Sequence, residues 1–257
     1  MSSRILLVGL GKMGGALLKG WSRANSFVVS TLDPNTNDSD YQSSEEITTK
    51  FDVVVLAVKP QIITEVTASL KQIITPSTLV LSIAAGKTIS FYEGLLGQET
   101  AIIRAMPNTP ALVGKGISVL CGNKSTTQTQ AQLAMNLMSS VGDAEWINDE
   151  KLMDAITALS GSGPAYVFHL IEAMTDAGIK MGLTPALSAK LARQTVIGSA
   201  ALAAQETNET VASLRKNVTS PGGTTEAALK VLCSENGLTD LMTRAIQAAT
   251  DRGKELA

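Results

Sequence analysis

The sequence predicts an α/β fold, with a doubly wound domain over residues 1–150 followed by an all-α domain over residues 151–257. Two observations support this. In the first part, short apolar runs of strand length alternate with helical patterns. From about residue 150 onward, strand signals vanish and helical patterns follow one another. Continuous apolar strands separated by helices favour a parallel sheet that helices cover on both faces.

The elements of the first domain follow in order along the chain. The expected strands are the short apolar runs Ile5–Val8, Phe27–Leu32, Val53–Val58, Leu79–Ile83, Ile102–Ala105 and Gly116–Leu120. The expected helices have apolar residues at helical spacing and cover Met13–Arg23, Ile62–Ile74 and Gln128–Val141.

The second domain is expected to be helical throughout. Its helical patterns cover Lys151–Ser160, Ala165–Met181, Pro185–Gln205, Val211–Lys216, Thr225–Ser234 and Leu238–Glu255. Several are apolar on more than one side, and the alanines at 200, 201, 203 and 204 permit close helix packing. A helix that is apolar nearly all round must be buried. A region of this size cannot bury that much surface alone, so the sequence predicts a homodimer through the helical domain, as such or within a larger homo-oligomer.

Composition excludes several classes of function. Lys and Arg number 21 against 23 Asp and Glu, no basic stretch stands out, and aromatic residues make up 4% of the chain. Nucleic acid is therefore not expected as a partner. Lys12 and Lys19 interrupt the first apolar region, and no uncharged apolar segment reaches the length of a membrane span. We expect a cytoplasmic protein that does not bind membranes.

The cysteine and histidine content limits the chemistry. Cys121 and Cys233 are far apart and have no metal-ligand spacing. One disulfide is conceivable, but free thiols in a reducing cytosol are favoured. The single histidine, His169, lies in an apolar helical segment, where a packed core residue is favoured over a catalytic one. Neither a metal site nor a Ser-His catalytic pair is expected.

A glycine pattern follows the first strand and opens the first helix. The run Val8-Gly9-Leu10-Gly11-Lys12-Met13-Gly14 contains G-x-G-x-x-G in the context that a dinucleotide-binding Rossmann domain requires. Gly9 allows the tight turn, Gly11 lets a pyrophosphate approach the backbone, and Gly14 permits close packing of helix on strand. The sequence therefore predicts a nicotinamide dinucleotide cofactor.

Asp33 is the candidate ribose ligand, because it ends the second strand 19 residues after Gly14. An acidic residue there binds the 2′-hydroxyl of the adenosine ribose, which favours NAD. Asp33-Pro34-Asn35 is also good turn chemistry. No arginine lies nearby in sequence, but Thr31, Asn35 and Thr36 offer hydrogen bonds to a 2′-phosphate. The choice between NADPH and NADH stays open.

Further strand ends are expected to line the same cleft, since ligands of open α/β sheets bind beyond the carboxyl ends of strands. Ala57-Val58-Lys59-Pro60 ends the third strand, and Ile83-Ala84-Ala85-Gly86 offers small residues where a flat ring can lie. Asn108, in the run 106–110, is a candidate contact for substrate or cofactor. The run Ser160-Gly161-Ser162-Gly163-Pro164 either forms a wall of the substrate pocket, with Ser162 in contact, or joins the two domains.

The second half contains a glycine-rich turn before a helix, Ser220-Pro221-Gly222-Gly223-Thr224-Thr225. Such a turn leaves backbone N–H groups unpaired, and the helix dipole favours an anion there. The turn is interpreted either as a site for a small carboxylate or as a capped helix start with Glu226 in its first turn.

Seven runs in this order resemble the pyrroline-5-carboxylate reductase family, which catalyses the last step of proline biosynthesis. They are residues Val8–Gly14, Ala57–Pro60, Ser82–Gly86, Arg104–Pro110, Leu159–Tyr166, Lys180–Leu183 and Val218–Thr225, and together they span nearly the whole chain. The first run is shared by many dehydrogenases, whereas the last is highly specific in this order. Residues 207–211 differ from relatives that carry a His-Pro pair, and Asp33 differs from members with a small polar residue there.

The resemblance implies a Rossmann domain, an interlocking helical domain, and reduction of 1-pyrroline-5-carboxylate to L-proline with NADPH or NADH. It places the substrate carboxylate on Ser220 to Thr225 and makes the Thr225 hydroxyl the group nearest the imine nitrogen. Whether that hydroxyl donates a proton or only orients the substrate stays open. A protonated imine needs neither a metal nor a strong protein base, so the enzyme mainly aligns two rings.

Two alternatives remain beside this one. The first is another imine- or hydroxyacid-directed dehydrogenase of the same architecture. The β-hydroxyacid dehydrogenases carry a catalytic lysine after such a turn, but here no lysine follows residues 161–164 until Lys180. A non-catalytic dinucleotide-binding protein would not need to retain the second site at Ser220 to Thr225.

Overall fold

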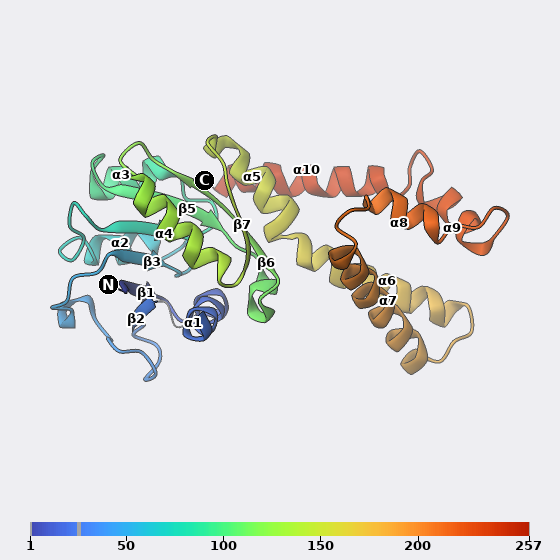
Figure 1. The fold of residues 1–257 in the computed structure, drawn as a ribbon, viewed down its shortest axis with the longest axis horizontal. Helices are drawn as coiled ribbons and strands as arrows, with labels where there is room; N and C mark the ends of the chain where they lie inside the picture. The colour runs from blue at the N-terminus through green and yellow to red at the C-terminus, as the bar shows by residue number, and fades with distance from the viewer. Residues whose placement is uncertain (1, 25–26, 257) are drawn as a thin grey trace. The chain divides into compact units, whose positions relative to one another are not determined.

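The computed structural model describes residues 2–24 and 27–256. The chain divides into two compact units, one of Met1–Ser162 with Ala249–Ala257 and one of Gly163–Ala248. Figure 1 shows the succession of elements along the chain. The expected domain boundary after residue 150 stays a prediction, and the outer limits of the two expected domains, residues 1 and 257, lie outside the described residues.

The first unit contains one seven-stranded sheet in the order β2-β1-β3-β4-β5-β6-β7. The strands are β1 (Ser3–Val8), β2 (Phe27–Leu32), β3 (Val53–Leu56), β4 (Leu79–Ser82), β5 (Ala101–Met106), β6 (Gly116–Gly122) and β7 (Gly142–Trp146). All expected strands are present, although β3 ends before Val58. The sequence prediction missed β7, whose residues Gly-Asp-Ala-Glu-Trp lack an apolar run. β1 lies between β2 and β3, where the strand order reverses, and this is where such sheets bind ligands.

The sheet is parallel, as expected, except at one pairing. Neighbouring strands from β2 to β5 pair in parallel, but β6 runs antiparallel to β5, with Ile103 opposite Gly122 and Met106 opposite Val119. The reason is the connection, since only the short 3-10 segment η2 (Thr109–Val113) links these two strands. A parallel pairing would need a long crossover, usually a helix.

The first four helices of the chain are α1 (Lys12–Ala24), α2 (Ile63–Ser69), α3 (Ile89–Leu96) and α4 (Gln128–Ser139), and a 3-10 turn η1 (Ser44–Glu46) follows β2. α2 is shorter than the expected Ile62–Ile74, because after Leu70 the chain continues in turns closed by bonds such as Ile73 N to Leu70 O (3.0 Å). α3 was not expected. The hydroxyl of Thr88 caps it by accepting a hydrogen bond from Phe91 N.

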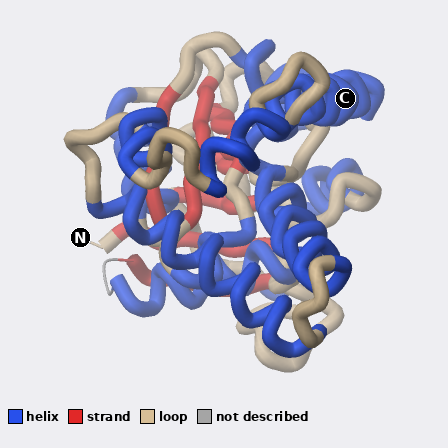
Figure 2. Tube along the Cα trace, turned by 90° about the vertical axis from the view of Figure 1, so that its right-hand side faces the viewer, coloured by secondary structure: helices blue, strands red, loops and turns tan. Residues whose placement is uncertain are grey.

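Side chains of successive strand residues bury on opposite faces of the sheet, as the period of two requires. Ile5 and Leu7 pack with α1 and α4 on one face, whereas Leu6 and Val8 pack with α2 and α3 on the other. The indole of Trp21 also donates to Leu137 O at 2.9 Å, which joins α1 to α4. Figure 2 distinguishes the strands from the helices and loops by colour.

The sequence predicted one helix over Lys151–Ser160, but the structure has three short segments there. They are the 3-10 turn η3 (Glu150–Leu152), α5 (Met153–Ile156) and the π-turn η4 (Thr157–Gly161). The helices that follow are α6 (Gly163–Lys180), α7 (Pro185–Gln205), α8 (Val211–Asn217), α9 (Thr224–Leu232) and α10 (Leu238–Leu256). Each lies within two residues of its predicted start and end.

The second unit buries almost nothing within one chain. Of the described residues 163–248, Ser188 and Ala192 are buried. α6 and α7 form a hairpin held by the Ser188 hydroxyl, which donates to Thr175 O at 2.6 Å. Large apolar side chains stay exposed along these helices, among them Phe168 at 62%. This is the unburied apolar surface that the sequence predicted.

No helix within the described residues is both long and apolar enough to cross a membrane. Both cysteines are free, with Cys121 buried in the sheet and Cys233 exposed. Burial is the main cause that raises the pKa of the Cys121 thiol to about 11.

Candidate functional site

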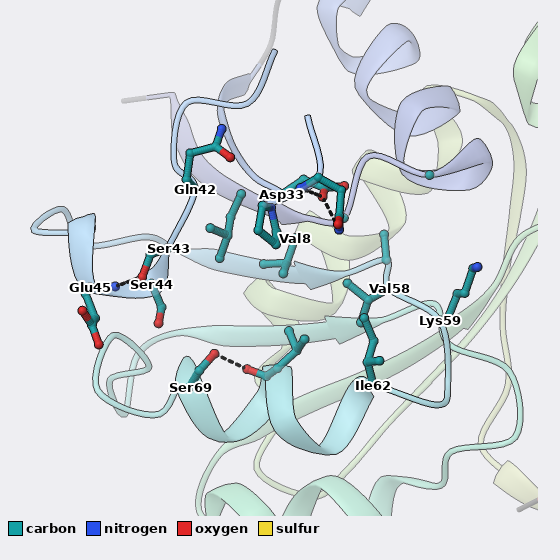
Figure 3. A pocket seen from close by; sticks show the side chains of 17 residues that line it. Val8, Asp33, Gln42, Ser43, Ser44, Glu45, Val58, Lys59, Ile62 and Ser69 are labelled. Carbon is teal, nitrogen blue, oxygen red and sulfur yellow. Dashed lines mark hydrogen bonds between the residues drawn. The ribbon is translucent and has the colours of Figure 1, made fainter. Parts of the chain in front are cut away.

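A pocket of about 690 Å³ lies at the carboxyl ends of β1, β2 and β3. Figure 3 shows side chains from these strand ends, from η1 and from α2 around it. Of the residues that the sequence predicted to contact a cofactor, the lining contains Val8, Gly9, Gly11, Asp33, Ala57, Val58 and Lys59. The strand-end argument therefore brings residues far apart in sequence to one pocket.

The glycines of the turn differ in what surrounds them. Gly9 has a φ of +98°, which favours glycine, and a Cβ there would press on Ala57 O at 2.9 Å. A Cβ on Gly14 would collide with Gly9 O, so Gly14 sets the close packing of α1 on the turn. A Cβ on Gly11 would meet nothing within 4 Å. The open side of the turn is therefore at Gly11, where the prediction places the pyrophosphate.

Asp33 is tied to the glycine turn. Its carboxylate accepts hydrogen bonds from Leu10 N at 2.7 Å, Asn35 N at 2.9 Å and Asn35 Nδ2 at 3.2 Å. Partial burial acts to raise the pKa of Asp33, but these hydrogen bonds outweigh it and hold the pKa below its ordinary value. Asp33 is therefore an anion at neutral pH, fixed between the turn and the loop that follows β2.

The sequence offered Thr31, Asn35 and Thr36 as hydrogen-bond partners for a 2′-phosphate, and the structure excludes Thr31. Thr31 is buried, and its hydroxyl donates to the Asp40 carboxylate at 2.9 Å, so it is not available to a ligand. The Thr36 hydroxyl accepts from Asp38 N, and Thr36 is not part of the lining. Asn35 does line the pocket, although its amide is bonded to Asp33.

Other expected cofactor contacts lie outside this pocket. They are Leu10, Lys12, Met13, Gly14, Pro60, Ile83, Ala84 and Ala85. Ala84 is buried in the core, and Gly86 lies against the end of α10, where its Cβ would be 3.1 Å from Leu256 O. A contact of residues 83–85 with a nicotinamide ring stays a prediction.

Sequence reasoning missed part of the lining, namely Leu32, Pro34, Gln42, Ser43, Ser44, Glu45, Ile62, Val66 and Ser69. Leu32 and Pro34 flank Asp33 and could have been found from the strand end. The residues of η1 and α2 carry no such signal, because a pattern along the chain does not show which loop folds over which strand.

Asn108 has a structural role in this chain. Its Oδ1 accepts from Ile117 N at 3.0 Å, and its Nδ2 lies 3.4 Å from both the carbonyl and the hydroxyl oxygen of Ser160. It therefore links the start of β6 to the π-turn η4. Ser162, half-buried, closes that turn by donating its N–H to Thr157 O at 2.9 Å. Substrate contacts of Asn108 and Ser162 stay predictions.

A buried ion pair anchors the segment that leaves the sheet. Arg104 Nη1 on β5 lies 2.6 Å from Glu150 Oε1 at the start of η3, and the two side chains are 7% and 29% exposed. The same carboxylate oxygen accepts from Ile89 N at 2.7 Å. One carboxylate thus joins β5, the start of α3 and the chain leading toward the second unit.

The turn before α9 has both features between which the sequence left a choice. Gly222 has a φ of +72°, and its N–H donates to Glu226 Oε2 at 2.9 Å, so the acidic residue does cap the turn. The N–H groups of Thr224 and Thr225 have no hydrogen-bond partner among the described residues. The free donors that a carboxylate needs are therefore present.

A doubly wound sheet with a glycine-turn pocket defines the class of the dinucleotide-binding oxidoreductases. Residues 4–86 match the family described as "NADP oxidoreductase coenzyme F420-dependent", and residues 150–256 match "Pyrroline-5-carboxylate reductase dimerisation". The chain belongs to the pyrroline-5-carboxylate reductase family.

The relatives cover the chain from end to end. The pyrroline-5-carboxylate reductase of Pseudomonas aeruginosa is 41% identical over 267 residues, covering 99% of this chain and 97% of its own. The solved structure of a pyrroline-5-carboxylate reductase from Coxiella burnetii is 38% identical in sequence and has a TM-score of 0.91. The match covers 100% of this chain and 99% of that one. The crystal structure of the Plasmodium falciparum pyrroline carboxylate reductase with NADP bound is 35% identical in sequence and has a TM-score of 0.85. The match covers 99% of this chain and 98% of that one.

Proposed function

We propose that this chain reduces 1-pyrroline-5-carboxylate to L-proline with NAD(P)H. The full-length likeness to reductases of that name, at 41% identity in the P. aeruginosa relative, is the observation that carries the proposal. In the reaction, the cofactor supplies a hydride to the ring carbon of the C=N bond, and the nitrogen acquires a proton from solvent or a hydroxyl. The C=N double bond becomes a C–N single bond.

The pocket at the strand ends fits the dinucleotide. The open side of Gly11 leaves room for a pyrophosphate beside the bare backbone, and the ionised Asp33 offers oxygens to ribose hydroxyls. The chain's own residues therefore hold and orient the cofactor. Val58, Ile62 and Val66 supply an apolar wall to the same pocket, suited to a flat base.

The turn at Ser220 to Thr225 is proposed to hold the substrate. Its free amides at Thr224 and Thr225 offer hydrogen bonds to the carboxylate, and the half-buried Thr225 hydroxyl orients or protonates the ring nitrogen. Two chains are proposed to associate through the helical domain, because the exposed apolar side chains of α6 and α7 need a partner to cover them. The second unit would then be folded stably only as part of a homodimer.

The test is the oxidation of NADH and NADPH by the purified protein, followed by absorbance, with 1-pyrroline-5-carboxylate and with β-hydroxyacids in parallel. We expect oxidation with the imine alone, with L-proline as the product identified by mass spectrometry. Oxidation with hydroxyacids alone would support the first alternative. Cofactor binding without turnover on any of these compounds would support the non-catalytic one.

A further inference from the structure

We propose that Tyr92 is a positioning residue for hydride transfer, because through the Ser82 hydroxyl it holds the segment Ile83 to Ala85 against the nicotinamide half of the cofactor. The inference rests on the proposed function and adds to it a residue that neither the glycine motif nor a strand end indicates. Tyr92 is fully buried on α3, so it acts through Ser82 and does not touch the ligand.

The order of the strands sets the direction in which the cofactor extends. With the ribose at Asp33 after β2 and the pyrophosphate at Gly11 after β1, the nicotinamide half extends across β3 toward β4, because β1 and β3 separate β2 from β4. The next strand end in that direction is Ile83 to Ala85. Ile83 N donates to Leu56 O at 3.1 Å, which puts this segment directly beside Ala57 of the pocket lining.

One hydroxyl fixes the start of this segment. Ser82, the last residue of β4, is buried, and its Oγ accepts a hydrogen bond from Ala84 N at 3.2 Å. The same oxygen lies 2.6 Å from the Tyr92 hydroxyl. Burial is the main cause that raises the pKa of Tyr92 above its ordinary value, so the phenol keeps its proton at neutral pH. The pair thus links the backbone of the segment to α3 by neutral hydrogen bonds.

The α3 end of this link is itself held in place. Glu150 Oε1 accepts from the N–H of Ile89, the first residue of α3, at 2.7 Å, and the same oxygen is paired with Arg104 on β5. The Thr88 hydroxyl caps the helix. Bonds independent of Tyr92 therefore fix α3 to the sheet, and the phenol oxygen has a defined position from which to hold Ser82.

The exposure of the segment indicates which of its residues a ring can meet. Ala84 is buried in the core, whereas Ile83 is half-buried and Ala85 is exposed. Ala84, whose N–H is bonded to Ser82, anchors the segment, and its two neighbours form the surface for a flat ring. A shift of this surface moves the nicotinamide relative to the imine carbon, and a misplacement of about 1 Å can cost about 100-fold in rate.

The experiment compares wild type with Tyr92→Phe, Ser82→Ala and the double variant. Tyr92→Phe keeps the buried ring and removes its oxygen alone. We expect kcat with the imine to fall about 10-fold to 100-fold in each single variant. The Kd for NADH or NADPH, whichever wild type binds more tightly, should change less than about threefold, because the glycine turn and Asp33 hold the other half of the cofactor. The double variant should lose no more kcat than Ser82→Ala, because both changes break one link.

Thr78→Val is the matched control. Thr78 precedes β4 at its opposite end, is buried, and donates its hydroxyl to Phe51 O at 3.2 Å. The variant thus removes a buried hydroxyl beside the same strand and leaves the carboxyl end of the strand intact. Urea denaturation measures the loss of stability in both variants, and we expect kcat to stay at the wild-type value in Thr78→Val.

A second readout needs no imine. The fluorescence lifetime of the reduced cofactor, bound at saturation, reports on the surroundings of the nicotinamide ring and should change in Tyr92→Phe and Ser82→Ala but not in Thr78→Val. Wild-type kcat in Tyr92→Phe would overturn the proposal, and so would an equal loss of kcat in Thr78→Val. If wild type did not reduce the imine, the proposed function would fail, whereas the lifetimes would still test the position of the ring. Equal lifetimes in wild type and all variants would then overturn the inference.

Discussion

The Asp33 carboxylate, at the end of β2, accepts a 2.7 Å hydrogen bond from the N–H of Leu10 in the glycine turn. The residue expected to bind ribose therefore also braces the turn expected to bind pyrophosphate. Its pKa is depressed in the folded protein. The stabilisation from this carboxylate is thus fully present above the pKa of the unfolded chain and is lost as the pH falls through the folded pKa.

Replacing Asp33 should therefore weaken cofactor binding and change its selectivity. We expect Asp33→Ser to raise the Kd for NADH roughly 10-fold to 100-fold, since a hydrogen bond to a charged group contributes about 1.5–3 kcal/mol. The Kd for NADPH should rise less, because a repulsive charge is also removed. Fluorescence titration measures both constants, and Asp38→Ser, an exposed change in the same loop outside the lining, is the control. A ratio equal to that of wild type would show that Asp33 only braces the turn.

Substitutions at Gly14 and Gly11 should separate an effect on stability from an effect on cofactor binding. Gly14→Ala places a methyl group against Gly9 O and should lower the free energy of unfolding by roughly 1–3 kcal/mol, as overpacking does. Gly11→Ala adds a methyl group in open space and should change it by no more than about 1 kcal/mol. Urea denaturation measures this difference.

The same Gly11→Ala variant should bind NADH at least about tenfold more weakly, a loss of about 1.4 kcal/mol, because the methyl group occupies the path of the pyrophosphate. Wild-type affinity in a folded Gly11→Ala protein would mean that the cofactor does not cross this point. The pair thus tests the assigned position of the pyrophosphate directly.

Thr225 should matter for turnover and Thr224 much less. We expect Thr225→Ala to lower kcat by roughly 10-fold to 10³-fold, the range for loss of one polar transition-state contact. Thr224→Ala, at the neighbouring and more exposed position, is the matched control for the helix start. Steady-state kinetics with the imine provide the measurement, and circular dichroism checks that both variants fold. Wild-type kcat in Thr225→Ala would exclude the proposed role.

The Arg104–Glu150 pair should be important for stability. Arg104→Met leaves the Glu150 carboxylate partly buried without its cation, and we expect a loss of about 2–4 kcal/mol of unfolding free energy, slightly below the range for fully buried pairs. Arg252→Met removes an exposed pair with Glu255 and should cost less than about 1 kcal/mol. Chemical denaturation measures both, and equal losses would contradict the distinction by burial.

Much of the fold was predictable because its determinants are local. Phe27–Leu32 and Pro185–Gln205 begin and end where the pattern predicted, since an apolar β-branched run and a Thr184-Pro185 cap act within a few residues. The direction of β6 was not predictable from its own apolar run. It depends on the short connection through η2, which is too short for the crossover that a parallel pairing needs.

The candidate site divides in the same way. The sequence by itself determined the glycine turn, Asp33 and the turn before α9, because spacing along one strand–turn–helix unit decides those positions. The tertiary structure alone decided that Glu45 and Ser69 reach the cofactor pocket, that Thr31 is committed to Asp40, and that Asn108 is bonded to Ser160. These contacts join segments that are distant in sequence or lie on different loops, and a charge or amide acts on whatever the folded chain brings within a few ångströms of it.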